Sequence, residues 1–291
     1  MGGADDDEGY KQPALTPLQR KQPALTPLQR IDTFREQGFL RLPLLSQESC
    51  QKLREYVLAD LEAALLQPEK ELRFSAIRKR TNRWDLKLEA SPIVRSAMHE
   101  ILLCDNYLDS ILAPLCRCDD AKDVVLAELG SVISHPGAPA QEWHADSAHT
   151  GSELTDCICC FVTLQDTPLT MGPTEILPDT HTGAFHKSAV ANFPPKGLMP
   201  AYASPKSMQA GYRHAGDACL MDARLYHRGG ANVGTENDND DCRRLVFYFT
   251  IRSRNAPHPG GFLFTIMEEL NGMQLVQFLE NEQQEEETNN I

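Results

Sequence analysis

The hydrophobic positions divide the chain into a first part with helical spacing and a longer second part with short apolar runs. A leucine or valine recurs every four residues in one stretch, at Leu53, Val57, Leu61 and Leu65. This spacing places the four side chains on one helix face, and Ser46 stands where the N-cap of that helix is expected. A second helix is predicted within "ASPIVRSAMHEILL", with Ser91 as its N-cap and Pro92 at its first position.

Short apolar or alternating runs in the remainder of the chain predict β-strands. The runs are "VVLAEL" at 124–129, "CICCFVTL" at 157–164, "DACLMD" at 217–222 and "LVFYFT" at 245–250. Gly, Pro and Asp separate them, which is typical of the turns in a sandwich or small barrel. The sequence therefore predicts a mainly β protein with N-terminal helices and an antiparallel β core.

One folded domain is predicted over residues 31–275, because no linker-like stretch divides it. The helices form a preface at about residues 31–120, and the β core follows at about residues 121–255. Residues 276–291 are predicted to form an acidic tail, since glutamates crowd there beside Asn and Gln and such a composition does not bury a core.

Residues 1–30 are predicted to be a flexible extension that contains a tandem duplication. The segment "KQPALTPLQR" occurs at residues 11–20 and again, unchanged, at residues 21–30. Two such units are too few to stack as a solenoid. The second copy runs directly into "IDTFREQGFLRLP", so it is interpreted as the lead-in to the first helix, and a docking role for the repeat stays open.

Composition and charge narrow the classes of function. The formal net charge of −13 argues against a general nucleic-acid binder, because a phosphate backbone would be repelled. No apolar stretch approaches the roughly 18–20 residues needed to span a membrane, and "MGGADDDEGY" lacks the features of a signal peptide. The nine cysteines show neither a zinc pattern nor a disulfide framework, so reduced thiols and a cytoplasmic location are expected.

The stretch "QEWHADSAHT" at residues 141–150 holds three side chains of metal-ligating type, His144, Asp146 and His149. On an extended segment His144 and Asp146 project to the same side. His227 is the best third ligand, because it follows the predicted strand "DACLMD" and precedes a glycine-rich turn. Two histidines and one carboxylate leave three open positions on an octahedral metal, as in the facial triad of non-haem Fe(II) oxygenases.

His149 has two interpretations. It lies three residues beyond Asp146 and would face the opposite side of a continuing strand, as a residue of the pocket wall or surface near the substrate. In a tetrahedral zinc site, His149 would instead join His144 and His227, and the protein would be a zinc hydrolase.

Four blocks in a fixed order resemble a known family. They are "WHAD", "MGPTEILPDTH" at 171–181, "GDACLMDARLYHRGGAN" at 216–232 and "RRLVFYFT" at 243–250. Together they resemble the phytanoyl-CoA dioxygenase family of Fe(II)- and 2-oxoglutarate-dependent oxygenases. The likeness extends upstream to "FREQGFLRLPLLSQESCQKLREYV" and covers about residues 30–252.

The resemblance implies a double-stranded β-helix, the jelly-roll barrel of the cupins, with iron at its mouth. His144, Asp146 and His227 match the family's metal ligands. Because Asp146 stands where halogenases have Gly or Ala, the chain is similar to hydroxylase-type members. The implied reaction uses Fe(II), 2-oxoglutarate and O2, and it releases succinate and CO2 while a small organic molecule is hydroxylated, desaturated or cyclised.

The resemblance also places the cosubstrate. The family's 2-oxoglutarate arginine follows the distal histidine, and alignment of "YFT" assigns this role to Arg244. A guanidinium suits a dicarboxylate because its fork donates two parallel hydrogen bonds. "TENDND" at residues 235–240 looks like an insertion, so Arg243 stays an alternative. Gln141 and Thr174 are further candidate contacts of the cosubstrate. The side chains expected to share the face of Arg244 are Val246, Tyr248 and Thr250.

A basic segment at residues 73–88 is the candidate contact of the substrate. Arg80 and Arg83 lie within it in an otherwise acidic chain, so they would grip an anionic group on a small-molecule substrate, with His149 nearby. A solvated helix or loop surface would explain the same charges. A non-catalytic cupin-like binding protein is the alternative to an enzyme, and no nucleic acid or membrane is expected as a partner.

Overall fold

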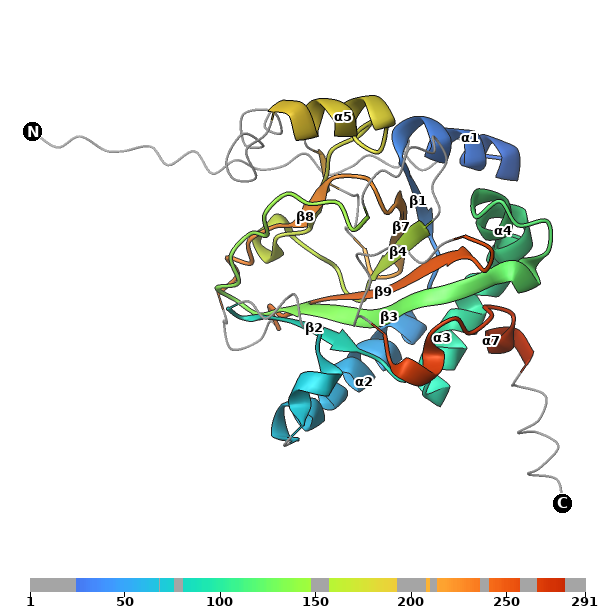
Figure 1. The fold of residues 1–291 in the computed structure, drawn as a ribbon. Coiled ribbons are helices and arrows are strands. Elements are labelled where there is room, and N and C mark those ends of the chain that lie inside the picture. Colours follow the sequence, from blue (N-terminus) through green and yellow to red (C-terminus); the bar gives the residue numbers. More distant parts are fainter. Residues whose placement is uncertain are drawn as a thin grey trace, which may run out of the picture.

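The computed structural model describes residues 25–67, 69–75, 81–147, 157–192, 208–209, 214–235, 241–256 and 266–280. Two antiparallel sheets form its centre (Figure 1). The large sheet has the strand order β1 (Phe39–Pro43), β7 (Asp217–Asp222), β4 (Cys157–Thr163), β9 (Arg244–Ser253), β3 (Val124–Ser134), β2 (Arg83–Lys87). The small sheet has the order β6 (Met208–Gln209), β5 (Thr174–Ile176), β8 (His227–Gly229). The four predicted apolar runs are thus confirmed as β3, β4, β7 and β9.

Helices precede, interrupt and follow these strands. The α-helices are α1 (Pro27–Gln37), α2 (Gln47–Leu66), α3 (Pro92–Leu103), α4 (Ala113–Leu115), α5 (Gly183–Asn192) and α7 (Gln277–Glu280). Short 3-10 or π turns are η2 (Lys70–Arg73), η3 (Cys104–Asn106), η4 (Leu108–Leu112), η5 (Ala121–Asp123), η6 (Leu169–Met171) and η7 (Glu268–Leu270). Helices α2, α3 and α7 lie on one face of the large sheet, and β8 of the small sheet lies on the other (Figure 1).

Strand β9 shows that the large sheet has a hydrophobic core on each of its two faces. Successive side chains of a strand point to opposite faces. Leu245, Phe247, Phe249 and Ile251 belong to the core beneath the helices. Val246 and Tyr248 belong to a second core between the sheets, which Ile176 of β5 joins. Each large apolar side chain buried this way contributes about 1.5–3 kcal/mol. The predicted common face of Arg244, Val246 and Tyr248 is therefore confirmed, and it is the inner face of the barrel.

The helix caps follow the sequence, and the apolar stripe does so with one exception. Ser46 accepts a hydrogen bond from the Ser49 N–H at the start of α2, and Ser91 accepts one from Val94 at the start of α3. Leu53, Val57 and Leu61 are buried, as predicted. The prediction was wrong for Leu65, which is 37% exposed, while Ala64 is buried. Steps of four residues drift around a helix of 3.6 residues per turn, so the stripe leaves the core at its end.

Three segments differ from their predicted boundaries. Helix α1 begins at Pro27 with Thr26 in a capping box, so it starts inside the second ten-residue copy. Strand β2 lies within the stretch expected to be a helical preface. Phe278 in α7 is buried, so packed structure reaches into the segment expected to be an acidic tail. Among the described helices, none combines the length and apolarity needed to cross a membrane.

We expect Gly216→Ala to destabilise the fold more than Gly272→Ala. Both glycines have a positive φ, 88° and 77°, so both substitutions strain the backbone, which costs about 1–3 kcal/mol. A Cβ at Gly216 would also overlap the carbonyl oxygen of Leu45, whereas nothing lies within 4 Å at Gly272. Urea unfolding of both variants measures the difference, and equal losses would contradict the close approach at Gly216.

Candidate metal centre

His144 and His227 are joined by their backbones. The His144 N–H donates to the His227 carbonyl (3.0 Å), and the His227 N–H donates to the His144 carbonyl (2.8 Å). This isolated antiparallel bridge attaches the segment after β3 to the first residue of β8. It places the two imidazole ring centres 4.5 Å apart. Two residues beyond His144, the side chain of Asp146 reaches the same space.

The three side chains converge with their ligating atoms within 4.8 Å of one another. His144 Nε2 lies 3.8 Å from Asp146 Oδ1, and His227 Nε2 lies 3.6 Å from Asp146 Oδ2. The Nδ1 atoms face backbone carbonyls, that of Glu142 at 2.8 Å and that of Leu225 at 3.0 Å. A carbonyl accepts, so Nδ1 carries the proton and Nε2 keeps the lone pair that binds a metal. The donor set therefore fits a divalent metal of intermediate softness.

Arg244 and Arg243 point to opposite sides of the barrel wall. Arg244 is 2% exposed and donates to the carbonyl of Gly172 and to Ser134 Oγ (3.3 Å). Arg243 instead donates to Asp241 through Nε (2.8 Å) and Nη2 (2.7 Å) on the outside. Arg244 pairs with Ser134 in the β3–β9 register, which assigns it to the inner face. Arg243, the alternative, does not reach the metal centre.

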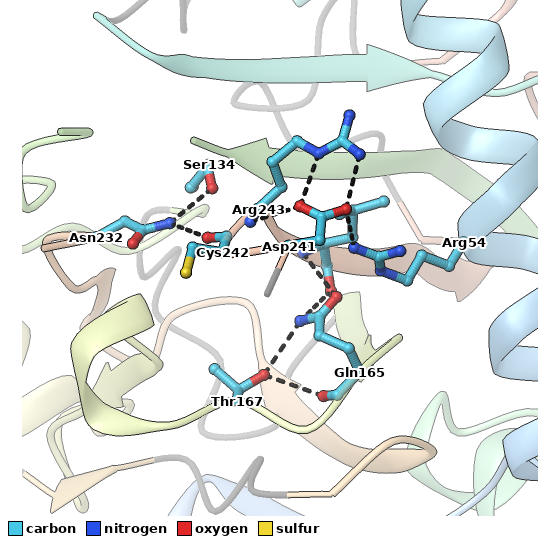
Figure 2. Close-up of polar contacts among 9 residues, drawn as sticks. Arg54, Ser134, Gln165, Thr167, Asn232, Asp241, Cys242 and Arg243 are labelled. Atoms are coloured by element: carbon cyan, nitrogen blue, oxygen red, sulfur yellow. Dashed lines mark hydrogen bonds and ion pairs between the residues drawn. The ribbon is translucent and has the colours of Figure 1, made fainter. Parts of the chain in front are cut away.

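Asp241 holds the start of β9 in place. Figure 2 shows its carboxylate between Arg243 and Arg54, and Arg54 comes from α2 (2.5 Å). Burial alone would raise the pKa of Asp241, but hydrogen bonds from Arg243 and Arg54 outweigh this effect and hold the pKa well below its ordinary value. Asn232 adds a second tie, since its Nδ2 donates to the carbonyls of Ser134 (2.9 Å) and Cys242 (2.8 Å). The strand carrying Arg244 is thus anchored from outside the barrel.

The path from His227 to Arg244 crosses Gly229. The Gly229 N–H donates to Gln141 Oε1 (2.8 Å), and Thr174 pairs with Gly229 across β5 and β8. A Cβ on Gly229 would lie 2.8 Å from Gln141 Oε1 and 3.0 Å from Arg244 Nη2. The missing side chain keeps this space clear. Gln141 and Thr174, both singled out from the sequence, therefore adjoin Gly229 between His227 and Arg244.

The comparison with known protein families identifies the class of this protein. The model described as Phytanoyl-CoA dioxygenase (PhyH) matches residues 34–237, which is more than half of the chain. The chain belongs to the phytanoyl-CoA dioxygenase family. Membership places it among the non-haem iron, 2-oxoglutarate-dependent oxygenases. No match was found among curated proteins.

Solved structures of low sequence identity share the fold of this family member. HygX from Streptomyces hygroscopicus with iron bound has 17% identity and a TM-score of 0.54, with 81% of this chain and 90% of that chain covered. AviO1 from Streptomyces viridochromogenes Tue57 has 18% identity and a TM-score of 0.52, with 82% of this chain and 100% of that chain covered. A HygX structure with nickel and 2-oxoglutarate bound has 18% identity and a TM-score of 0.52, covering 81% and 90%. The predicted jelly-roll core is thereby confirmed.

The basic segment is organised differently from the sequence interpretation. Arg83 is not on an exposed surface but is 2% exposed on β2, where Nε donates to Ser134 Oγ (2.9 Å) and Nη2 to the Gly230 carbonyl (2.9 Å). It therefore lies beside Arg244. The alternating pattern of "RWDLK" is that of a strand with one charged face, so Arg83 points to the interior and the solvated-surface alternative does not hold for it. Arg80 and His149 lie outside the described residues.

A thiol that was not predicted from the sequence lies beside the candidate metal centre of this family member. Cys159 on β4 is fully buried, and its Sγ donates to Asp146 Oδ2 (3.6 Å). Burial raises the pKa of this thiol well above its ordinary value, and the negative charges of Asp146 and Glu128 add to the effect. No motif marks Cys159, because its place follows from strand register alone.

We expect Asp241→Asn to lower the free energy of unfolding by about 0.5–1 kcal/mol at pH 7, the size expected for a partly exposed ion pair. The folded-state pKa of Asp241 is depressed, so its stabilising effect is complete above the unfolded pKa near 3.9 and is lost as the pH falls below it. Urea unfolding at pH 7, 5 and 3 compares the two proteins. A difference that grows between pH 5 and pH 3 would contradict the assignment.

Proposed function

We propose that this protein oxidises a small organic molecule with Fe(II), 2-oxoglutarate and O2, and that His144, Asp146 and His227 hold the iron. The observation that carries the proposal is the convergence of the three ligating atoms within 4.8 Å, with the inward-facing Arg244 across Gly229. Two histidines and one carboxylate leave three positions open on the metal. Iron held by these side chains would have room for the 2-keto acid group of the cosubstrate and would supply the oxidation chemistry.

Arg244 is proposed to bind the distal carboxylate of 2-oxoglutarate. Its guanidinium is buried, and such a fork meets a carboxylate in two parallel hydrogen bonds. Arg83 is proposed as a second contact, because both guanidiniums donate to Ser134 Oγ, at 2.9 Å and 3.3 Å. A carboxylate bound there would lie within reach of both guanidiniums, and each could donate to it. The Gln141 amide and the Thr174 hydroxyl would orient the carbon chain of 2-oxoglutarate between its 2-keto acid group and its distal carboxylate.

The remaining residues of the inner face protect the reaction. When bound, the iron and its cosubstrate supply an oxidant that removes hydrogen from carbon, with succinate and CO2 as co-products. Phe161 lies against His227, with ring centres 5.9 Å apart, and Met221 and Leu225 are buried in the same inner core. These side chains exclude water from one side of the metal, which limits side reactions of the oxidant. Asp146 as third ligand supports hydroxylation, or related desaturation or cyclisation.

Succinate release tests this proposal against both alternatives. We expect the wild-type protein, with Fe(II), to release succinate from 2-oxoglutarate only in the presence of O2. His144→Ala and Asp146→Ala should abolish this release, because each removes one of three ligands. Release in both variants would contradict the ligand assignment. A zinc hydrolase would act without O2 or 2-oxoglutarate, and a cupin-like binding protein would release no succinate.

Arg244→Ala and Arg243→Ala are a test variant and its matched control for binding of the cosubstrate. We expect Arg244→Ala to raise the KM for 2-oxoglutarate by about 30-fold or more, because removing one partner of a buried charge pair costs about 2–5 kcal/mol. Arg243→Ala should change this KM by less than about 5-fold, since a partly exposed ion pair contributes about 1 kcal/mol or less. Initial rates over a range of 2-oxoglutarate concentrations measure both, and equal effects would refute the assignment.

A further inference from the structure

We propose that Cys159 is a positioning residue that fixes the orientation of the Asp146 carboxylate for metal binding. The proposal rests on the proposed function, in which Asp146 is a ligand. The Cys159 thiol donates to Asp146 Oδ2 over 3.6 Å. That oxygen also faces His227, while Oδ1 faces His144. The carboxylate thus stands between the two imidazoles with one oxygen held from the sheet.

Asp146 needs such support because its own backbone is irregular. It lies in a bend after the His144 bridge and belongs to no strand. The χ2 torsion of an aspartate is broad and does not by itself select one orientation of the oxygens. Cys159, in contrast, lies on β4, which is paired on both sides, with β7 and β9. The hydrogen bond therefore holds the carboxylate of Asp146, a ligand on a loop, against a strand that is paired on both sides.

The hydrogen bond of the neighbouring Thr250 hydroxyl supports donation from the Cys159 thiol to Asp146. Cys159 lies opposite Thr250 of β9 in the strand register. The Thr250 hydroxyl donates its single proton to the buried carboxylate of Glu128 (2.5 Å). It therefore has no proton left for the thiol. The thiol proton is directed to Asp146, because a carboxylate is a stronger acceptor than a hydroxyl oxygen.

The consequence is a change in metal affinity rather than in the fold. Groups that hydrogen-bond to metal ligands typically change the affinity for the metal by about 10–100-fold when they are replaced. A thiol is a weak donor, so the expected effect lies at the lower end of this range. Serine at position 159 would keep a donor at nearly the same place, whereas alanine or valine would not.

Binding of Co(II), followed by its visible absorption without turnover, tests the proposal. We expect Cys159→Ala to weaken Co(II) binding by about 10-fold and Cys159→Ser to bind within about 2-fold of the wild type. Cys160→Ala is the matched control, because Cys160 is equally buried on the same strand but faces the helical core. It should bind Co(II) within about 2-fold of the wild type. Cys159→Val, which restores volume without a donor, replaces the alanine variant if that variant does not fold.

Two outcomes overturn the proposal. Unchanged Co(II) affinity in Cys159→Ala, or in Cys159→Val, would show that the thiol does not position the ligand. An equal loss in Cys159→Ser and Cys159→Ala would assign the effect to packing rather than to hydrogen bonding. Asp146→Ala separates this proposal from the proposed function. If Asp146→Ala binds Co(II) normally, Asp146 is no ligand. If Asp146→Ala loses Co(II) binding but Cys159→Ala keeps the wild-type affinity, only the role of the thiol is refuted.

Discussion

The mutual backbone hydrogen bonds between His144 and His227 are the interaction on which the centre depends. They join two segments far apart in the sequence and make the two imidazoles neighbours. Asp146 follows at a distance of two residues, so the bridge brings its side chain close to the two imidazoles, and the Cys159 thiol contacts one of its oxygens. Backbone pairing also orients the rings, since the Nδ1 atoms of both histidines face carbonyls two residues upstream. A metal ligand set built this way does not rely on flexible side chains.

The second constraint is the alternation of β9. Its outward apolar side chains pack beneath the helices, and this packing keeps its inward side chains in register with β3. Arg244 faces inward for that reason, and Arg243, one residue earlier, faces outward to Asp241. The ion pairs of Asp241 with Arg54 and Arg243 then connect the first long helix to the strand that carries Arg244. Helical core and reaction centre are therefore coupled through one strand.

The inner face of the barrel carries more charge than an ordinary core. Arg83, Glu128 and Arg244 are all buried there, each with hydrogen-bonding partners. Burying a charge is costly unless it is paired and hydrogen-bonded, so such a face is retained where polar ligands must be bound. The apolar residues Phe161 and Met221 line the same face nearer to the metal ligands. Charged and apolar side chains thus occupy different parts of the inner face of one sheet.

The sequence by itself determined the strands β3, β4, β7 and β9, the helix caps, the family and the identity of the three candidate ligands. Periodicity, capping residues and motif order are local properties of the chain. Only the tertiary structure decided which of Arg243 and Arg244 faces the inside of the barrel, since a shift of one residue exchanges the two faces of a strand. It also turned Arg83 inward on β2 and brought Cys159 against Asp146. These contacts depend on strand pairing between distant segments, and no local pattern records which residues will meet across a sheet.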